Sequence, residues 1–169
     1  MSRPRVSVRP AAPADADALL TLIDALADYE KLERPAPDAR ERLIRDAFSA
    51  SPPRFTVLLA ESDASADGRP VGYAILLETY SSFLAKPTLY LEDLFVLPEA
   101  RGIGAGSALF RAAAEEANRR GCGRMEWVCL DWNQLAIDFY ERRGAQHLRD
   151  WRYYRLDGDA LERFSPRRE

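Results

Sequence analysis

The chain has 169 residues, which fits a single domain built on one hydrophobic core. Hydrophobic residues make up 47% and charged residues 30%, and the net charge is −3, so a nucleic-acid partner is disfavoured and a globular protein is indicated. No apolar run approaches the roughly 18 residues of a membrane helix, and no signal peptide is apparent, so we expect one cytoplasmic domain over residues 1–169 with no membrane partner.

The first half of the chain predicts one strand, two helices and a hairpin. A short strand at 6–10 precedes a helix at 13–31 with apolar residues at helical spacing, and a second helix follows at 38–48. Strands at 55–61 and 71–78 flank a polar turn, which indicates a β-hairpin. This half therefore favours antiparallel pairing.

The second half alternates strands and helices. After a loop at 80–87, a strand at 90–96, an alanine-rich helix at 104–120 and a strand at 124–129 form a βαβ unit, which should be parallel and right-handed. The predicted fold class is therefore α/β, with a mixed, mostly antiparallel sheet that contains one parallel pair and is flanked by helices.

The chain is expected to close with a short helix and further strands. The helix at 134–143 ends at Gly144, in the position of a left-handed C-cap. One or two strands are expected at 146–157, and the tail beyond them is charged.

The cysteines and the histidine do not indicate a metal site. Cys122 and Cys129 lie among apolar residues without the spacing of metal ligands, so we expect reduced thiols. His147 is the only histidine, and a lone histidine does not build a zinc site. No metal is therefore expected.

Most of the chemistry lies where the strand 89–96 runs into the glycine-rich turn 101–106, which opens a helix. Amides at a helix start lack intrahelical acceptors, and the helix dipole favours negative charge there, so the turn predicts a phosphate site. Glu92 and Asp93 interrupt the apolar strand nearby. Together these features predict an enzyme that joins a nucleotide cofactor to a cationic substrate.

Three phosphate motifs compete for this turn. A P-loop needs a lysine after the last glycine, but Ser107 and Ala108 follow Gly106. A dinucleotide fingerprint needs a glycine at position 107, so that motif is also disfavoured. The remaining pattern, Arg/Gln-x-x-Gly-x-Gly/Ala, is met by Arg101, Gly104 and Gly106.

These blocks resemble the GCN5-related N-acetyltransferase (GNAT) family, most of all its diamine acetyltransferases of the spermidine/spermine and thialysine types. The similar segments are 8–11, 26–30, 89–96, 101–107 and 131–145, so the resemblance covers nearly the whole chain. The glycine motif gains weight from the later block Asn-x-x-x-x-x-Phe-Tyr-x-x-x-Gly, which begins at Asn133. The resemblance implies the GNAT fold and acetyl-CoA as cofactor.

The resemblance also implies how acetyl-CoA is held. Backbone amides of the turn would bind the diphosphate with added charge from Arg101, and the strand backbone and Asn133 would pair with the pantetheine arm. The implied cofactor-binding residues are Leu94, Phe95, Val96, Arg101, Gly102, Ile103, Gly104, Ala105, Gly106, Ser107, Asn133 and Tyr140.

Two residues are implied to be catalytic. Tyr140 resembles the family tyrosine that protonates the departing thiolate, which a phenol with a pKa near ~10 can do. An amine with a pKa of about 10.4 is neutral in only about one molecule in a thousand at pH 7, so a base is needed. Glu92, acting through water, is expected to supply it, and a strand N–H near Leu94 to stabilise the carbonyl oxygen.

Asp93 should point to the face opposite Glu92, because strand side chains alternate. If both carboxylates reach the cleft, a β-bulge is needed, and the resemblance implies one. Plainer interpretations stay open: the glycines as an ordinary turn, Tyr140 as a core aromatic, and the carboxylates on a solvated edge strand.

The amine itself is less well specified. Contacts to it are expected from Tyr29, Glu30, Glu92, Asp93 and Asp150. The loop before the key strand has the form Tyr-Asp-Pro-Trp-x-Gly in the diamine subgroup, whereas residues 80–85 read Tyr-Ser-Ser-Phe-Leu-Ala. The missing acid argues against long polyamines, and a smaller amine or a basic amino acid is equally plausible.

The block 151–156 resembles the last strand of the subgroup, which takes part in dimerisation, so a homodimer is implied. The main prediction is an amine N-acetyltransferase. Two alternatives stay open: a CoA-binding regulatory module without turnover, and a dinucleotide-dependent oxidoreductase.

Overall fold

A five-stranded sheet is the frame on which the functional residues are placed. The computed structural model describes residues 4–65 and 68–164, in which one compact unit ends at Val128 and a smaller one begins at Cys129. The strands and helices of the first unit are β1 (Val6–Pro10), α1 (Ala16–Glu30), α2 (Pro37–Ile44), β2 (Thr56–Ser62), β3 (Gly72–Ser81), β4 (Lys86–Val96), α3 (Ala105–Arg119) and β5 (Arg124–Glu126). Three short helical turns complete it: η1 (Pro13–Asp15), η2 (Arg45–Ser49) and η3 (Pro98–Ala100).

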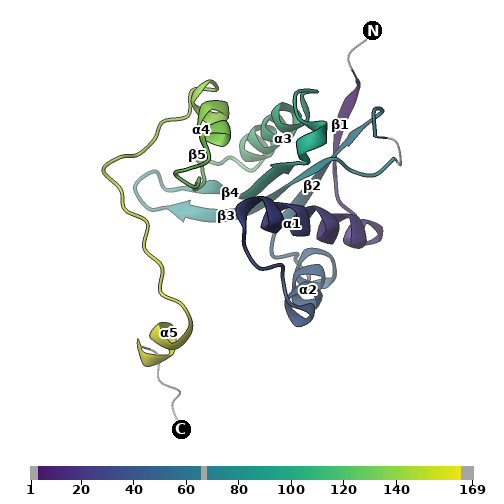
Figure 1. The fold of residues 1–169 in the computed structure, drawn as a ribbon. Coiled ribbons are helices and arrows are strands. Elements are labelled where there is room, and N and C mark those ends of the chain that lie inside the picture. The colour runs from purple at the N-terminus through teal and green to yellow at the C-terminus, as the bar shows by residue number, and fades with distance from the viewer. Residues whose placement is uncertain (1–3, 66–67, 165–169) are drawn as a thin grey trace. The chain divides into compact units, whose positions relative to one another are not determined.

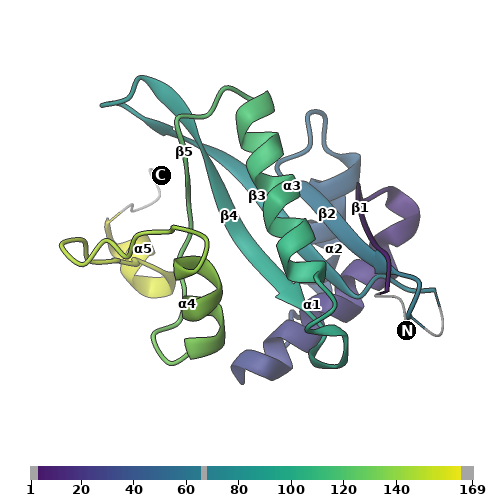
Figure 2. The same cartoon turned by 90° about the horizontal axis from the view of Figure 1, so that it is seen from above.

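The strand order in the sheet follows the chain, β1-β2-β3-β4-β5. The first four strands pair antiparallel, and β5 pairs parallel to β4 after the crossover through α3. The predicted fold class is therefore confirmed. Figure 1 shows α1 and α2 on one side of this sheet and α3 on the other, and Figure 2 shows α3 lying across the strands.

Each face of the sheet has its own hydrophobic core. On the α3 face, Leu76, Leu89 and Leu109 are buried in an aliphatic cluster. On the α1 face, Leu19 and Tyr73 are buried in a cluster that also contains Phe95. Neighbouring residues of a strand contribute to opposite clusters because strand side chains alternate. The strand predicted at 90–96 therefore contributes side chains to both cores.

The hairpin between β3 and β4 is longer than predicted. Pairing continues through Thr79↔Thr88 to Ser81↔Lys86, so the expected loop at 80–87 is wrong and only residues 82–85 form the turn. The reason is that backbone pairing extends a hairpin beyond its buried part, even where the side chains at 78–80 are exposed and show no apolar pattern. β5 is in turn shorter than the predicted strand 124–129.

The smaller unit contains α4 (Gln134–Glu141) and α5 (Gly158–Phe164). Gly144 has φ +86°, and the Ala145 N–H donates to the Tyr140 carbonyl oxygen at 3.2 Å, which confirms the predicted left-handed C-cap. The predicted strands at 146–157 are wrong: this stretch has no ladder partner in the described chain, and its backbone bonds are local, such as Trp151 to Leu148. A strand pattern without a partner strand does not form a ladder.

Among the residues that the structure describes, no helix is both long enough and apolar enough to cross a membrane.

Candidate active site

One edge of β4 is only partly paired. β3 pairs with β4 along its whole length, whereas β5 pairs only with Thr88–Tyr90. Residues 91–96 therefore have no strand partner on that edge within the described part of the chain. Such an edge presents N–H and C=O groups to an extended ligand. This stretch contains three of the predicted pantetheine contacts, Leu94, Phe95 and Val96.

The predicted phosphate turn lies between the end of β4 and the start of α3. Gly102 has φ +82° and Gly104, the N-cap of α3, has φ +103°, a backbone region that suits glycine. A Cβ added at either glycine would meet no atom within 4 Å, so the space beside the turn is open. The first intrahelical hydrogen bond runs from the Ala108 N–H to the Gly104 carbonyl oxygen at 3.0 Å. The amides before Ala108 form the first turn of the helix, where no intrahelical acceptor is available. A diphosphate fits such a helix start.

Arg101 connects this turn to α1. Its guanidinium carbon lies 4.6 Å from the centroid of the Tyr29 ring and 5.9 Å from that of Phe95. Its Nε donates to the Val96 carbonyl oxygen at 3.2 Å. A cation this close to an aromatic face is attracted by the ring quadrupole. The phosphate contact of Arg101 stays a prediction, and the side chain has a further task in holding the end of α1 beside the turn.

A β-bulge places the two adjacent carboxylates. Leu91 pairs with Leu76 and Asp93 with Ile75, so Glu92 is an extra residue without a partner on β3. The bulge shifts the alternation by one residue: Leu91 lies in the cluster of the α3 face, whereas Phe95 lies in that of the α1 face. Asp93, two residues from Phe95, therefore shares the α1 face. The expectation that Asp93 points away from Glu92 holds only for a regular strand.

Asp93 is the more buried carboxylate of the pair, and Glu92 is exposed. The Tyr73 hydroxyl donates a hydrogen bond of 3.0 Å to Asp93 Oδ2. Burial, together with the negative charges of Glu92 and Glu30, raises the pKa of Asp93 to about 6, although the bond from Tyr73 opposes the rise. Burial likewise raises the pKa of Glu30 on α1.

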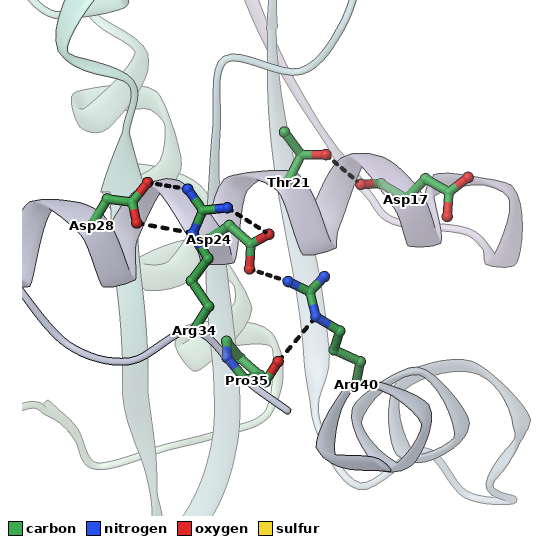
Figure 3. Close-up of polar contacts among 7 residues, drawn as sticks. All are labelled: Asp17, Thr21, Asp24, Asp28, Arg34, Pro35 and Arg40. Atoms are coloured by element: carbon green, nitrogen blue, oxygen red, sulfur yellow. Dashed lines mark hydrogen bonds and ion pairs between the residues drawn. The ribbon is translucent and has the colours of Figure 1, made fainter. Parts of the chain in front are cut away.

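Two carboxylates on α1 are paired with arginines (Figure 3). Asp28 forms a two-pronged ion pair with Arg34, and Asp24 forms an ion pair with Arg40. Arg40 Nε also donates to the Pro35 carbonyl oxygen at 3.0 Å. Glu30 has no such partner among the described residues. Glu30, Glu92 and Asp93 lie close enough for the first two to act on the third, and none of the three has a described counter-ion.

The smaller unit holds the other predicted site residues. Asn133 caps α4, because its Oδ1 accepts a hydrogen bond of 3.2 Å from the Ala136 N–H. Tyr140 lies in the last turn of α4 with its ring 5.3 Å from that of Phe139. Asp150 is exposed in the stretch without regular structure. The cofactor and catalytic roles of these residues stay predictions.

Sequence reasoning missed Tyr73. Its ring is wholly buried, in a strand whose neighbouring core residues are aliphatic. A buried tyrosine needs an acceptor for its hydroxyl, so a tyrosine among aliphatic core residues was the available signal.

Three comparisons place the chain among known proteins. A family model described as "Acetyltransferase (GNAT) family" matches residues 20–145. A thialysine N-epsilon-acetyltransferase of Bos taurus is 37% identical over 164 residues, which are 92% of this chain and 95% of the relative. An integron cassette protein from V. cholerae has a similar fold, with a TM-score of 0.77 at 23% identity over 96% of this chain and 98% of that one. An aminoglycoside N-acetyltransferase solved in complex with CoA gives a TM-score of 0.70 at 20% identity, over 90% and 95% of the two chains.

Proposed function

The chain belongs to the GNAT family of acetyltransferases, and from that premise we propose that it acetylates a small cationic molecule on a primary amine, with acetyl-CoA as donor. Family membership confirms the prediction of an N-acetyltransferase. The residue-level roles below, the choice of amine and the assembly are proposals.

The observation that carries the choice of a cationic amine is the group of unneutralised carboxylates around Asp93, on which Glu92 and Glu30 act. Glu30, Glu92 and Asp93 have no described counter-ion, whereas Asp24 and Asp28 are matched to arginines. Negative charges that face one another disfavour their own ionisation, and a bound ammonium relieves that cost. The group therefore suits a substrate that carries at least one positive charge.

The turn and the open edge of β4 fit the cofactor. The amides that precede Ala108 would hold the diphosphate, and the edge at 91–96 would pair with the pantetheine arm. Asn133 would add a contact to the same arm. Acetyl-CoA, when bound, supplies the thioester carbonyl that accepts the amine.

The chain has to remove a proton from the amine before the attack. A pH of 7 is about three units below the pKa of an ordinary amine, so nearly all of the amine is protonated. Removing that proton adds roughly 4–5 kcal/mol to the barrier. Glu92, exposed at the bulge, would take the proton through water, and the half-buried Asp93 would hold the ammonium that arrives. Tyr140 would hold a proton at its phenolic oxygen for the departing sulfur, and a strand N–H near Leu94 would face the carbonyl oxygen.

The loop between β3 and β4 favours a compact substrate. In place of the acid and the tryptophan of the diamine subgroup, this chain has Ser81 at the end of β3 and the fully exposed Phe83 in the turn. No carboxylate is then present in this loop for a distant second ammonium. A basic amino acid of the thialysine type, the substrate in the relative's name, fits better than a long polyamine.

We also propose that the protein is a single acetyltransferase domain over residues 1–169, a homodimer, and cytoplasmic. The family match from 20 to 145 crosses the boundary between the two compact units, which supports one domain. Trp151 and Tyr154 are 78% and 81% exposed in a stretch without a ladder partner, which supports pairing with a second copy. Cys122 and Cys129 are reduced thiols in the structure, which suits a reducing compartment.

The test is thiol release from acetyl-CoA with spermidine, putrescine, thialysine, lysine and small aromatic amines. We expect turnover with thialysine and lysine above that with spermidine. The Tyr140→Phe variant should lose turnover and keep acetyl-CoA binding. Binding of acetyl-CoA without thiol release for any amine would instead identify a binding module, and a wild-type rate in Tyr140→Phe would remove that residue from the mechanism.

A further inference from the structure

Tyr73 on β3 lies in the core of the α1 face and contacts Asp93, one of the three carboxylates of the site. Its side chain is fully buried beside Phe95, with ring centroids 6.4 Å apart. A phenylalanine would fill the same space, since the packing involves only the ring. The hydroxyl is therefore the part that needs an explanation, and the acceptor that it finds is Asp93 Oδ2 at 3.0 Å.

This contact depends on the bulge. In a regular strand of the same length, Asp93 would share the face of Leu91, which is the α3 face, and Tyr73 would have no access to it. With Glu92 as the extra residue, Asp93 comes to the α1 face opposite Ile75, two residues along β3 from Tyr73. The bulge and the tyrosine thus act on the same carboxylate.

We propose that Tyr73 is a positioning residue for the acetyl transfer: its hydroxyl fixes the Asp93 carboxylate on the α1 face in the ionised form that binds the substrate ammonium. The inference rests on the proposed function, because it deepens the role of Asp93 in that site. Oδ2 is occupied by Tyr73, and Oδ1, which accepts no hydrogen bond from a described residue, faces the incoming cation.

The charges around Asp93 explain why such a donor is useful. Glu92 on β4 and Glu30 on α1 both disfavour its ionisation, as does its own burial. Arg101, the cation near this face, is engaged with Tyr29 and the Val96 carbonyl oxygen. The Tyr73 hydroxyl is the one described group that lowers the pKa of Asp93, which stands at about 6 with the bond in place. A hydroxyl that donates to a carboxylate stabilises the anion without neutralising it, so the charge stays available to the amine.

The first experiment measures the ionisation of Asp93 directly. Carboxyl ¹³C shifts of the full chain, labelled at aspartate, are followed with pH in the wild type and in Tyr73→Phe, with Asp93→Asn to assign the signal. We expect the Asp93 midpoint near pH 6 in the wild type and about one pH unit higher in Tyr73→Phe, the size that loss of a hydrogen bond to a charged group implies. Equal midpoints in the two proteins would overturn the proposal, whether or not the protein acetylates any amine.

The second experiment asks whether catalysis uses this contact. The KM for thialysine is measured from pH 5.5 to pH 8.5 at saturating acetyl-CoA. In Tyr73→Phe we expect the acidic limb of kcat/KM to move up by about one pH unit, with KM near pH 6 raised several-fold and kcat at pH 8.5 little changed. In a protein that already carries Asp93→Asn, adding Tyr73→Phe should not move the acidic limb of kcat/KM any further.

Ile75→Val is the matched control, because Ile75 is buried on the same strand and face and its apolar side chain cannot hydrogen-bond to Asp93. It should lower the melting temperature without moving the limb. A limb that moves equally in Ile75→Val and Tyr73→Phe would show that Tyr73 acts only through packing. A wild type that is inactive on every amine, with an NMR midpoint that still moves in Tyr73→Phe, would refute the proposed function and leave the Tyr73–Asp93 coupling standing.

Discussion

The two faces of the sheet carry the same strands but different chemistry. The α3 face is closed by aliphatic side chains such as Leu76, Leu89 and Leu109. The α1 face begins with a similar core and ends, beside the glycine turn, in Tyr73, Asp93 and the end of α1. The difference arises from one extra residue in β4, since the bulge at Glu92 changes which side chains face which helix. The α3 face therefore contributes mainly to stability, whereas the α1 face contains the partly buried Asp93 carboxylate that we assign to substrate binding.

Removal of Glu92, which takes away the bulge and keeps the two faces as they are, should have the largest effect on activity. Deletion of Glu92 leaves Leu91 and Asp93 as neighbours on opposite faces, so a regular strand keeps every buried contact of both cores. We expect a folded protein whose kcat/KM for amine is about 10²–10⁴-fold lower, because the positioned base is lost. Glu92→Gln is the matched control: it keeps the bulge and should lose kcat to a similar extent.

The outcome that contradicts this account is a deletion variant with near wild-type turnover. Circular dichroism and thermal unfolding distinguish loss of activity from loss of fold. A Glu92→Gln variant with unchanged kcat would show that the bulge matters for geometry and that another group takes the proton.

Truncation on the other face should reduce stability and leave chemistry intact. Leu109→Ala opens a cavity under α3, where the side chain is fully buried, and should lower the free energy of unfolding by about 2–5 kcal/mol. Urea unfolding measures this loss, and kcat per folded molecule at low temperature should stay at the wild-type value. A large change in KM for the amine would mean that the two faces are not independent.

The buried charge of Asp93 should appear in the pH dependence of stability. Its pKa is raised from 3.8 to about 6 in the fold, so the folded state binds the proton more tightly than the unfolded state. This contribution to stability is complete below the unfolded pKa and is lost as the pH rises toward about 6. Asp93→Asn removes that loss and should be more stable than the wild type by about 2–3 kcal/mol at pH 8, with a gap that closes toward pH 4.

Unfolding midpoints in urea between pH 4.5 and pH 8 measure this gap. A difference between the two proteins that does not change with pH would contradict the assigned ionisation of Asp93. The variant should at the same time bind the amine more weakly, so that stability and function change in opposite directions.

The smallest effects belong to the ion pairs at the end of α1. The Arg40–Asp24 pair is the more enclosed, with side chains 29% and 19% exposed, and Arg40→Ala should cost about 1 kcal/mol of stability. The Arg34–Asp28 pair is 56% and 55% exposed, and Arg34→Ala should give no measurable change. Thermal unfolding of the two variants at low and high salt checks this order. An equal loss in both would show that exposure does not decide the strength of these pairs.

The sequence was sufficient where local patterns decide structure. Helical spacing predicted α1 and α3, and Gly144 predicted the left-handed C-cap that the structure has. It was insufficient where the structure depends on whether a strand finds a neighbouring strand. The aromatic residues of 146–157 read as a strand, but a strand needs a neighbour, and the pattern of side chains does not say whether one is available.

The site was predictable in its parts and not in its arrangement. Glu92 and Asp93 stood out as charges in an apolar strand, but their faces followed from the bulge, which side-chain alternation alone does not reveal. Tyr73 was overlooked because a tyrosine in a core strand is ordinary until its hydroxyl has to be given an acceptor.

The most direct test of the account is product analysis after incubation with acetyl-CoA and thialysine. Mass spectrometry should find one acetyl group on the amine for each free CoA thiol released, in the wild type and not in the Glu92 deletion. Thiol release without acetylated amine, or equal product from the deletion variant, would contradict the claim that Glu92 at the bulge prepares the amine for acetyl transfer.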